Sequence, residues 1–379
     1  MGCLAGTAII RQARIIARST NQTRPERPKR RNGVRKLKGI RAVAQRAGVA
    51  VSSVSRAFSP GESVSAETRA RIFEAARAVG YIPDAVARSL RRGTTSTIGC
   101  VVANIANPTF AQIITGAGQS LQSHGYAMLI ANSAEGAQNE VSQLETLQRH
   151  RVDGMLVSVV DESNRETRAQ LAAIKTPGVI LDRDLPGLAN FGRVLFDHQV
   201  GLTDAVAALA QLGHQRLAFI GGTPATRPTR ERSQAFVKAC GKLSITGITR
   251  PGSYADAHGE ASAHELLTST PAPSAIIAGS NQILIGVLRA ITTLGLRIPQ
   301  DVSLVTCDEV PLMDALQPKQ AVITRDLLLL GRESAEMLVS MIGGAPARTK
   351  VLPVSFRFGP SCGRPRAGSS TSDRLAIVQ

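Results

Sequence analysis

The chain has 379 residues, enough for two or three domains of about 100–200 residues each, and 43% of them are hydrophobic, so it is not globally disordered. No apolar run approaches the ~20 residues of a membrane span, and the five scattered cysteines form no CxxC pair, which argues against a disulfide framework and a zinc ribbon. The net charge is +17, and most of it lies at one end.

Basic residues are concentrated before residue 96. Residues 1–95 hold 20 Lys/Arg and 5 Asp/Glu, whereas the rest of the chain holds 25 and 23. A basic N-terminal segment followed by a nearly neutral remainder predicts nucleic-acid binding. We expect residues 1–38, with 11 basic residues and one acidic residue, to be a disordered extension. That extension is a DNA-binding arm, a solvated tail, or translated sequence upstream of the true start.

Helical periodicity begins at Gly39 and predicts three short helices. The first carries apolar residues at helical spacing and ends at Gly48, the second runs from Val51 to about Phe58, and the third covers residues 66–80. Ser65 opens the third helix as a capping box shifted by one residue, with Glu67 two residues on. A short helix, a three-residue turn and another short helix have the spacing of a helix-turn-helix.

From residue 97 the chain alternates apolar strand candidates with helical stretches. Buried strands in this alternation predict parallel sheets covered on both faces, and about nine strands suit two subdomains better than one sheet. The nine candidates are residues 97–105, 127–132, 154–160, 178–182, 193–197, 216–222, 275–280, 303–308 and 350–356.

Residues 40–90 resemble the DNA-binding headpiece of the lactose/galactose-repressor family of bacterial transcription factors. The resemblance extends to about residue 365, and its motifs occur in the family's order. They include Val54-Ser55-Arg56, Gly80-Tyr81-Ile82-Pro83, Ala106-Asn107-Pro108-Thr109-Phe110, Leu181-Asp182-Arg183-Asp184 and Val305-Thr306-Cys307-Asp308-Glu309.

The resemblance implies a specific organisation. A helix-turn-helix headpiece (39–83) is followed by a hinge helix and linker (84–95). An α/β core (96–366) then has two subdomains like those of periplasmic binding proteins, and residues 367–379 form a disordered tail. The core is expected to bind an effector and to form the dimer.

The second predicted helix corresponds to the family's recognition helix, which lies in the major groove. The expected DNA-contacting residues are Val51, Ser52, Ser53, Ser55 and Arg56. Ser55 alternatively contacts a phosphate or its own backbone. Family members usually carry Ser or Thr where Ala50 stands, so this helix lacks a side-chain cap, at a cost of about 1 kcal/mol.

The segment before the core resembles the family's hinge helix, which binds the minor groove against its dimer mate. Its expected DNA contacts are Ala87, Arg88 and Leu90, with Leu90 as the wedge that unstacks a central base step. The alternative is a plain interdomain linker.

The effector is expected between the two subdomains, at the carboxyl ends of the strands. The residues matching the family's pocket are Thr109, Phe110, Arg232, Asn281 and Asp308. Asp197, near a crossing between the subdomains, and Arg183 are further candidates for effector binding. Surface ion pairs are the alternative for the arginines and aspartates.

These patterns lead to one functional hypothesis and one rival. We interpret the chain as a cytoplasmic, nucleoid-associated transcriptional regulator that binds a pseudo-palindromic DNA operator as a homodimer under the control of a sugar or sugar acid. No cofactor, metal, membrane or catalytic constellation is expected, because no dinucleotide, zincin or P-loop motif occurs. The rival is a sugar-binding protein or sugar-active enzyme with a vestigial headpiece. Apolar helical faces in 110–123 and 282–294 are expected to supply the dimer contact.

Overall fold

The computed structural model describes residues 39–58, 64–82 and 93–366. The chain divides into two compact units, residues 1–84 and 85–379. The extension 1–38, the tail 367–379 and the hinge residues Ala87, Arg88 and Leu90 lie outside the described residues.

The first unit contains three helices around a small apolar core. They are α1 (Ile40–Ala47), α2 (Val51–Ala57) and α3 (Ala66–Val79). Gly48 and Gly80 end α1 and α3 in the left-handed conformation, with φ of 65° and 63°, which glycine adopts without strain. The buried core side chains are Val43, Ala44, Val54, Ala57, Ile72, Ala75 and Ala76.

The N-termini of α2 and α3 differ in their capping. The Ser65 hydroxyl accepts a hydrogen bond from the Thr68 amide at 3.3 Å and donates to the Thr68 hydroxyl at 2.9 Å. Thr68 therefore takes the third helical position, and Glu67 lies one residue before it, as the shifted capping box predicts. Ala50 precedes α2 and offers no side-chain cap, as the sequence predicts.

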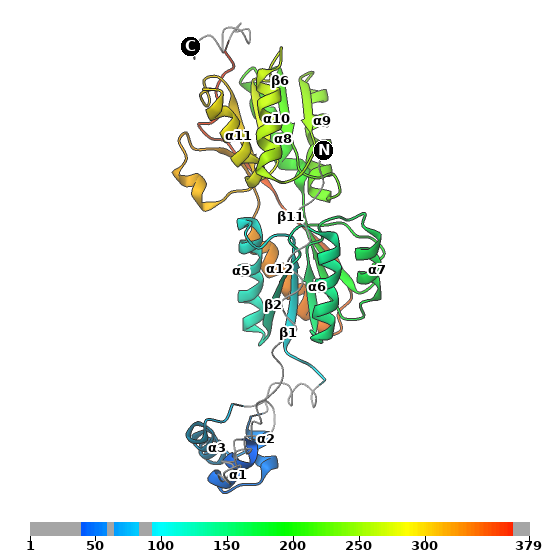
Figure 1. Cartoon of the computed structure of the whole chain (residues 1–379), viewed down its shortest axis with the longest axis vertical. Coiled ribbons are helices and arrows are strands. Elements are labelled where there is room, and N and C mark those ends of the chain that lie inside the picture. Colours follow the sequence, from blue (N-terminus) through cyan, green and yellow to red (C-terminus); the bar gives the residue numbers. More distant parts are fainter. Residues whose placement is uncertain (1–38, 59–63, 83–92, 367–379) are drawn as a thin grey trace, which may run out of the picture. The chain divides into compact units, whose positions relative to one another are not determined.

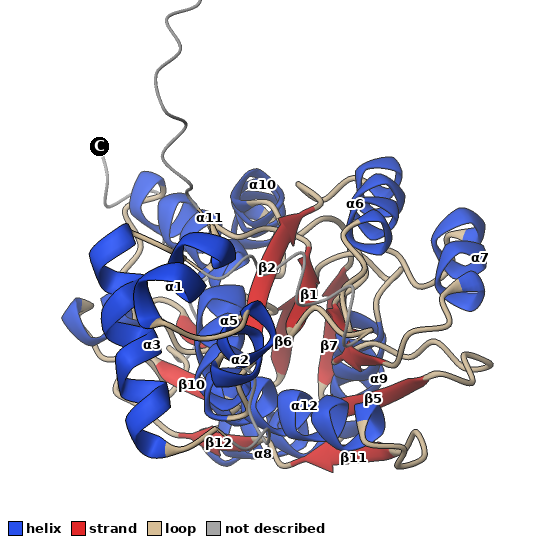
Figure 2. Cartoon of the chain, turned by 90° about the horizontal axis from the view of Figure 1, so that it is seen from below, coloured by secondary structure: helices blue, strands red, loops and turns tan. Residues whose placement is uncertain are grey.

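The first subdomain of the second unit is a parallel sheet between two helical layers. Its strand order is β11-β5-β4-β3-β1-β2. Helices α5 (Pro108–Ser123) and α12 (Leu327–Ile342) cover one face, and α6 (Ala137–Arg149) and α7 (Arg165–Ala173) cover the other (Figures 1 and 2). The strands are β1 (Thr97–Val102), β2 (Ala127–Asn132), β3 (Gly154–Val157), β4 (Gly178–Leu181), β5 (Phe191–Phe196) and β11 (Thr349–Leu352).

The second subdomain repeats this plan with one antiparallel edge. Its order is β12-β10-β9-β8-β6-β7, and only β12 runs antiparallel to its neighbour. Helices α8 (His198–Gln211) and α9 (Arg227–Lys242) pack together, as do α10 (Asp256–Thr268) and α11 (Asn281–Thr293), and η1 (Pro311–Ala315) follows β9. The strands are β6 (Arg216–Ile220), β7 (Thr246–Arg250), β8 (Ala275–Ala278), β9 (Ser303–Cys307), β10 (Ala321–Thr324) and β12 (Ser355–Arg357).

The described residues contain twelve strands rather than the nine we expected. The sequence interpretation missed β7, an edge strand whose side chains are all partly or fully exposed, and β10, which has only four residues. It also treated residues 350–356 as one strand, whereas they contribute to β11 and β12 in different sheets. The fold class itself, a helix-turn-helix unit and a two-subdomain α/β core, is confirmed.

Two helix pairs approach so closely that only glycine fits at the contact. A Cβ on Gly116 of α5 would lie 2.1 Å from the Leu328 carbonyl oxygen, and one on Gly331 of α12 would lie 2.1 Å from that of Ile113. Gly259 and Gly286 play the same reciprocal role between α10 and α11. The apolar faces in 110–123 and 282–294, which we expected at a dimer contact, are consequently buried inside the subdomains.

The chain crosses between the subdomains three times. The crossings follow β5 (residues 196–198), β10 (residues 324–327) and β11 (residues 352–355). None of the helices that the structure describes is both long enough and apolar enough to span a bilayer.

Candidate functional site

A cavity of about 490 Å³ lies between the two subdomains of the α/β unit. Its wall includes loops that follow strands of both sheets, among them Ser158 after β3, Asp182 after β4 and Asp308 after β9. The carboxyl ends of parallel strands are where open α/β sheets bind ligands, and the volume suits a small molecule.

Six of the seven side chains that we expected at the effector line this cavity, and all six are buried. These six are Thr109, Phe110, Arg183, Arg232, Asn281 and Asp308. Asp197 does not line the cavity. Its carboxylate caps the N-terminus of α8 and accepts from the Gln199 amide at 3.1 Å, because it directly precedes the helix at the first crossing.

Two buried polar atoms on the cavity wall have no hydrogen-bond partner. They are the Thr109 hydroxyl and the side-chain oxygen of Asn281, on residues only 7% and 5% exposed. The Asn281 amide nitrogen donates to the Asn107 side-chain oxygen at 3.0 Å, which fixes the Asn281 oxygen as the open acceptor. Buried polar groups are normally satisfied, so both atoms mark places where a bound molecule would form hydrogen bonds.

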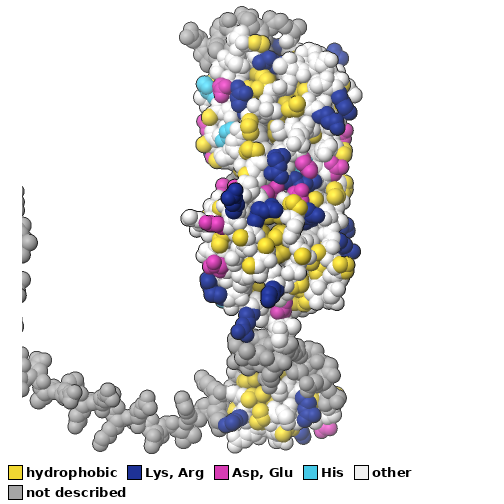
Figure 3. Space-filling view, turned by 90° about the vertical axis from the view of Figure 1, so that its right-hand side faces the viewer, with side chains coloured by type: hydrophobic (Ala, Val, Ile, Leu, Met, Phe, Trp, Pro, Cys, Tyr) yellow, Lys and Arg dark blue, Asp and Glu magenta, His cyan; other side chains and the backbone are white. Residues whose placement is uncertain are grey.

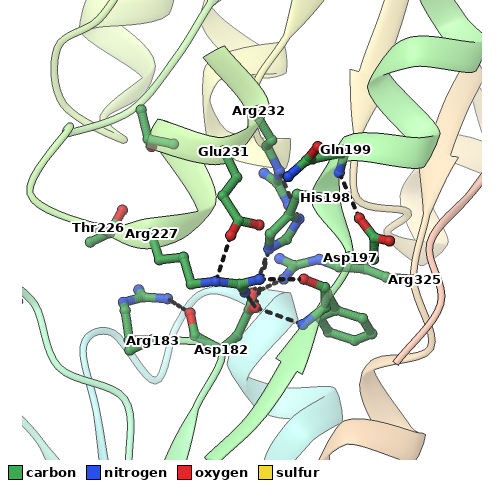
Figure 4. A network of polar contacts seen from close by, with 12 residues as sticks. Asp182, Arg183, Asp197, His198, Gln199, Thr226, Arg227, Glu231, Arg232 and Arg325 are labelled. Carbon is green, nitrogen blue, oxygen red and sulfur yellow. Dashed lines mark hydrogen bonds and ion pairs between the residues drawn. The ribbon is translucent and has the colours of Figure 1, made fainter. Parts of the chain in front are cut away.

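Asp182 anchors a polar network at the cavity floor (Figure 4). Its carboxylate accepts from the Phe196 amide at 3.1 Å and from the His198 Nε2 at 3.1 Å. It also forms an ion pair with Arg227 at 3.4 Å. The His198 ring extends the network to Arg232, because its Nδ1 accepts from Arg232 Nε at 3.3 Å.

Arg325, on the second crossing, joins the two aspartates. Its Nη1 lies 2.6 Å from Asp182, and its Nε and Nη2 lie 2.5 and 3.0 Å from the two oxygens of Asp308. Arg232 lies 3.6 Å from the same Asp308 carboxylate and donates to the Gly279 carbonyl oxygen at 2.7 Å. In Figure 3, side chains of both charge signs gather where the two subdomains meet.

Burial and neighbouring charges fix the ionisation of this network. Burial lowers the pKa of His198 to about 4, so the ring is neutral at physiological pH. Burial alone would raise the pKa of both aspartates. His198 and Arg325 nevertheless hold the pKa of Asp182 below its usual range, and Arg325 and Arg232 do the same for Asp308. Both carboxylates are therefore ionised, and each is compensated by at least one guanidinium.

The subdomains also touch directly on two sides of the cavity. On one side the buried Glu162 accepts from the Arg227 amide at 2.7 Å and pairs with Arg230 at 2.5 Å. Glu162 of the first subdomain thereby caps the N-terminus of α9 in the second. On the other side the Asn107 side chain donates to Gln282 at 3.2 Å. The structure is thus a conformation in which the two halves are already in contact across the cavity.

Known proteins combine the same parts. Residues 39–84 match the family described as "Bacterial regulatory proteins, lacI family", and residues 206–362 match the "Periplasmic binding protein-like domain". The ribose operon repressor of Haemophilus influenzae is 31% identical over 308 residues, which cover 80% of this chain and 91% of that protein. The chain belongs to the lacI family of bacterial regulatory proteins.

Solved structures of lacI-family proteins support the assignment. The lac repressor dimer bound to operator and the anti-inducer ONPF matches with a TM-score of 0.76 and 26% identity, over 85% of this chain and 98% of that chain. A LacI family transcriptional regulator from Enterococcus faecium with bound ribose matches with a TM-score of 0.64 and 25% identity, over 71% and 100%. The chain is accordingly a DNA-binding transcriptional regulator rather than an enzyme.

The lacI-family headpiece presents the start of α2 outward. Val51 is 42% exposed, Ser52 and Arg56 are also exposed, and Ser53 and Ser55 are half-buried. The Arg56 Nε lies 3.5 Å from the Ser52 carbonyl oxygen, so most of its guanidinium is available to another molecule. These five residues thus occupy a turn and a half of one accessible helix, whereas Val54 and Ala57 point into the core.

The sequence interpretation missed three members of the floor network: His198, Arg227 and Arg325. It named Asp182 only as part of the motif Leu181-Asp182-Arg183-Asp184, without a role in the site, and Asp184 of the same motif pairs with Arg193 at 2.6 Å. One available signal was that Asp182, His198 and Arg325 each lie next to the end of a strand. Among the described residues, no group of three or more His, Cys, Asp or Glu side chains could hold a metal ion.

Proposed function

We propose that this regulator is a homodimeric repressor that holds a pseudo-palindromic operator in the cytoplasm and responds to a sugar-like effector in the cavity. The observation that carries the effector assignment is the pair of unsatisfied buried atoms, Thr109 Oγ1 and Asn281 Oδ1, on the wall of a cavity of about 490 Å³.

A polyhydroxylated ligand matches this wall. Each sugar hydroxyl is both a donor and an acceptor, so one hydroxyl can donate to the Asn281 oxygen and another can bond Thr109. Phe110, also on the wall, offers an apolar surface for a sugar ring. The ribose bound to the E. faecium relative is a ligand of this chemistry.

The cavity is positioned to control DNA binding through domain closure. A ligand that bonds both Thr109 of the first subdomain and Asn281 of the second changes the free energy of their contact. We propose that residues 84–95 form the hinge helix and linker that transmit this change to the headpiece, 39–83. In this scheme residues 96–366 form the effector-binding core, flanked by the extension 1–38 and the tail 367–379.

For DNA we propose direct readout by α2. Arg56 can form a bidentate contact with guanine, Val51 can contact a thymine methyl group, and Ser52, Ser53 and Ser55 can bond bases or phosphates. Ala87 and Arg88 would follow the minor groove, with Leu90 as the wedge.

The proposed homodimer brings two recognition helices to two half-sites. Since the inner faces of α5 and α11 are buried, we propose that the contact uses other apolar side chains. Leu129 and Ile130 on the edge strand β2 and Ile285 on α11 are each at least 40% exposed and are available for it.

The decisive experiment measures operator affinity of the full-length protein by fluorescence anisotropy. An operator is first selected from genomic DNA. Arg56→Ala is then expected to weaken operator binding by about 1–3 kcal/mol while changing random-DNA binding far less. Arg77→Ala on α3 is the control that removes the same charge from the same unit.

If both variants lose equal affinity for operator and for random DNA, Arg56 contacts only a phosphate. Leu90→Ala, tested on the same two DNAs, separates a wedge from a linker. A panel of sugars that leaves operator affinity unchanged would contradict the effector assignment.

A further inference from the structure

The cavity floor holds more buried positive charge than negative charge. Arg183, Arg232 and Arg325 line it beside only two buried carboxylates, those of Asp182 and Asp308. Arg227, behind the floor, is matched by Glu231 at 2.8 Å. His198 adds no charge at neutral pH because burial lowers its pKa to about 4.

The excess can be assigned to one side chain. Arg325 bonds both aspartates, and Arg232 faces Asp308. Arg183, only 8% exposed, donates to two main-chain carbonyl oxygens, of Val159 at 2.9 Å and of Asp182 at 3.0 Å. It forms no ion pair within 4 Å with any residue that the structure describes.

Arg183 still has unused hydrogen-bonding capacity. A guanidinium has five N–H donors, and the two carbonyl bonds use one on Nε and one on Nη1. The Nη2 group and the second Nη1 proton remain for a ligand. In Figure 4 the guanidinium lies beside the Asp182 main chain, at the edge of the network and separate from the guanidinium of Arg325.

The acidic groups around Arg183 compensate it only in part, because its charge lowers the pKa of Glu140 and Asp182 but neither carboxyl forms an ion pair with it. Burial raises the pKa of Glu140 to about 7, and its oxygens accept from the Val160 amide at 2.8 Å and the Thr167 hydroxyl at 3.0 Å. Asp161 and Glu135, also on the cavity wall, are more accessible and bond Ser163 and Asn104. An unpaired cation so well removed from water is costly unless a bound anion meets it.

We propose that the effector is an anionic polyol, a sugar-sized molecule with one carboxylate or phosphate that binds the free edge of the Arg183 guanidinium. This inference rests on the proposed effector-controlled function and narrows its ligand class. The hydroxyls of the same molecule satisfy Thr109 and Asn281, and its anion completes the charge balance of the floor. Charge-assisted hydrogen bonds to guanidinium are roughly twice as strong as neutral ones. An anionic sugar derivative is therefore expected to bind more tightly than the neutral sugar from which it derives.

The test is isothermal titration of the full-length protein with two matched sets. One set is ribose, ribonate and ribose 5-phosphate, and the other is glucose, glucuronate and glucose 6-phosphate. At least one anion is expected to bind ~10-fold or more tighter than its neutral parent, and comparison of the two acids in each set distinguishes carboxylate from phosphate.

Variants of Arg183 connect the preference to this side chain. Arg183→Gln is expected to remove the ~10-fold preference, whereas Arg183→Lys retains a cation and part of the preference. Arg193→Gln, on β5 and outside the cavity wall, is the matched control and should leave the preference intact. Thermal unfolding of each variant shows whether it is folded, and the Lys variant keeps the test informative if the Gln variant is not.

The outcomes separate this inference from the proposed function. A neutral sugar that binds as tightly as its acids and shifts operator affinity overturns the anionic effector and leaves the sugar-responsive repressor standing. Operator affinity that no member of either set changes overturns both the anionic ligand and the sugar effector. Failure to bind any selected operator contradicts the repressor itself.

Discussion

The three-helix unit and the α/β unit use polar side chains in opposite ways. Every buried side chain in the described part of the helical unit is apolar, and its serines and Arg56 lie on or near the surface. The α/β unit buries Asp182, Arg232 and Asp308 in one connected network. A surface that meets a partner from solvent needs no internal charge compensation, whereas an enclosed pocket for a polar ligand does.

The difference has an energetic consequence that can be measured. Removing one member of a compensated buried network leaves another charge without its partner, but removing an exposed charge leaves only a hydrated surface. Substitutions should therefore be most costly in the floor network and mild at the surface or at helix ends.

The largest effect is expected for Arg325→Gln, which leaves Asp182 and Asp308 facing each other with less compensation. Breaking a buried ion pair typically costs 3–5 kcal/mol, and we expect a loss of about this size in the free energy of unfolding, measured with urea. Arg289→Gln is the control, since Arg289 pairs with Asp256 at the surface, where a pair contributes about 0–1 kcal/mol. Similar losses for both variants would contradict the distinction between the two environments.

The second effect is a pH dependence carried by His198. Its pKa is lowered to about 4, below the ~6.5 of an unfolded histidine, so the unfolded state takes up a proton first as the pH falls. Stability should therefore decrease between pH 6.5 and about 4, by up to about 3 kcal/mol at 1.36 kcal/mol per pKa unit.

His198→Gln removes this titration while keeping a donor and an acceptor at the same place. The difference between the pH profiles of the two proteins isolates His198, because His214, whose pKa is also lowered by burial, is present in both. Profiles that remain parallel across this interval would show that the ring does not titrate as its burial requires.

A smaller effect is expected at the helix caps. Ala50→Ser supplies the missing cap of α2, and Ser65→Ala removes the cap of α3, each changing helix stability by about 1 kcal/mol in opposite directions. Amide hydrogen exchange in the full-length protein reports the local opening of each helix. If Ala50→Ser leaves exchange in α2 unchanged, the first turn is fixed by other contacts.

The smallest expected effect is that of deleting residues 367–379, which should leave the proposed dimer unchanged. Only Leu375, Ile377 and Val378 of this segment are large and apolar, too few for one heptad seam. Ile285→Glu, on the exposed side of α11, is the contrasting variant and should weaken the dimer. Sedimentation showing a larger assembly that dissociates on the deletion would contradict this.

Local sequence patterns predicted the local features well. Spacing of apolar residues located α1, α2 and α3, and Gly48 and Gly80 marked helix ends. Ala50, where the family usually has Ser or Thr, indicated an uncapped α2. Each of these depends on residues within one or two turns, so the sequence contains the required information.

The pocket was predictable only in part. Family motifs indicated Arg232 and Asp308, but nothing near Arg325 in the sequence shows that it bridges two aspartates, one of them 143 residues away. Asp197 was misplaced for the related reason that a side chain beside a crossing can turn either into the cavity or onto the next helix. Pairing across sheets depends on tertiary packing, which a single sequence does not specify.

The reciprocal glycine contact between α5 and α12 has a consequence for synthesis on the ribosome. The face of α5 that carries Gly116 stays uncovered until α12 is synthesised roughly 200 residues later. At 5–20 residues per second this delay is about 10–40 s. The second subdomain is continuous from residue 198 to 324 apart from its edge strand β12, which follows α12, so most of it is free to fold before then. The nascent chain can thus fold five strands of its second sheet before its first sheet is covered by α12, and the unfinished first sheet is the stage most exposed to chaperones.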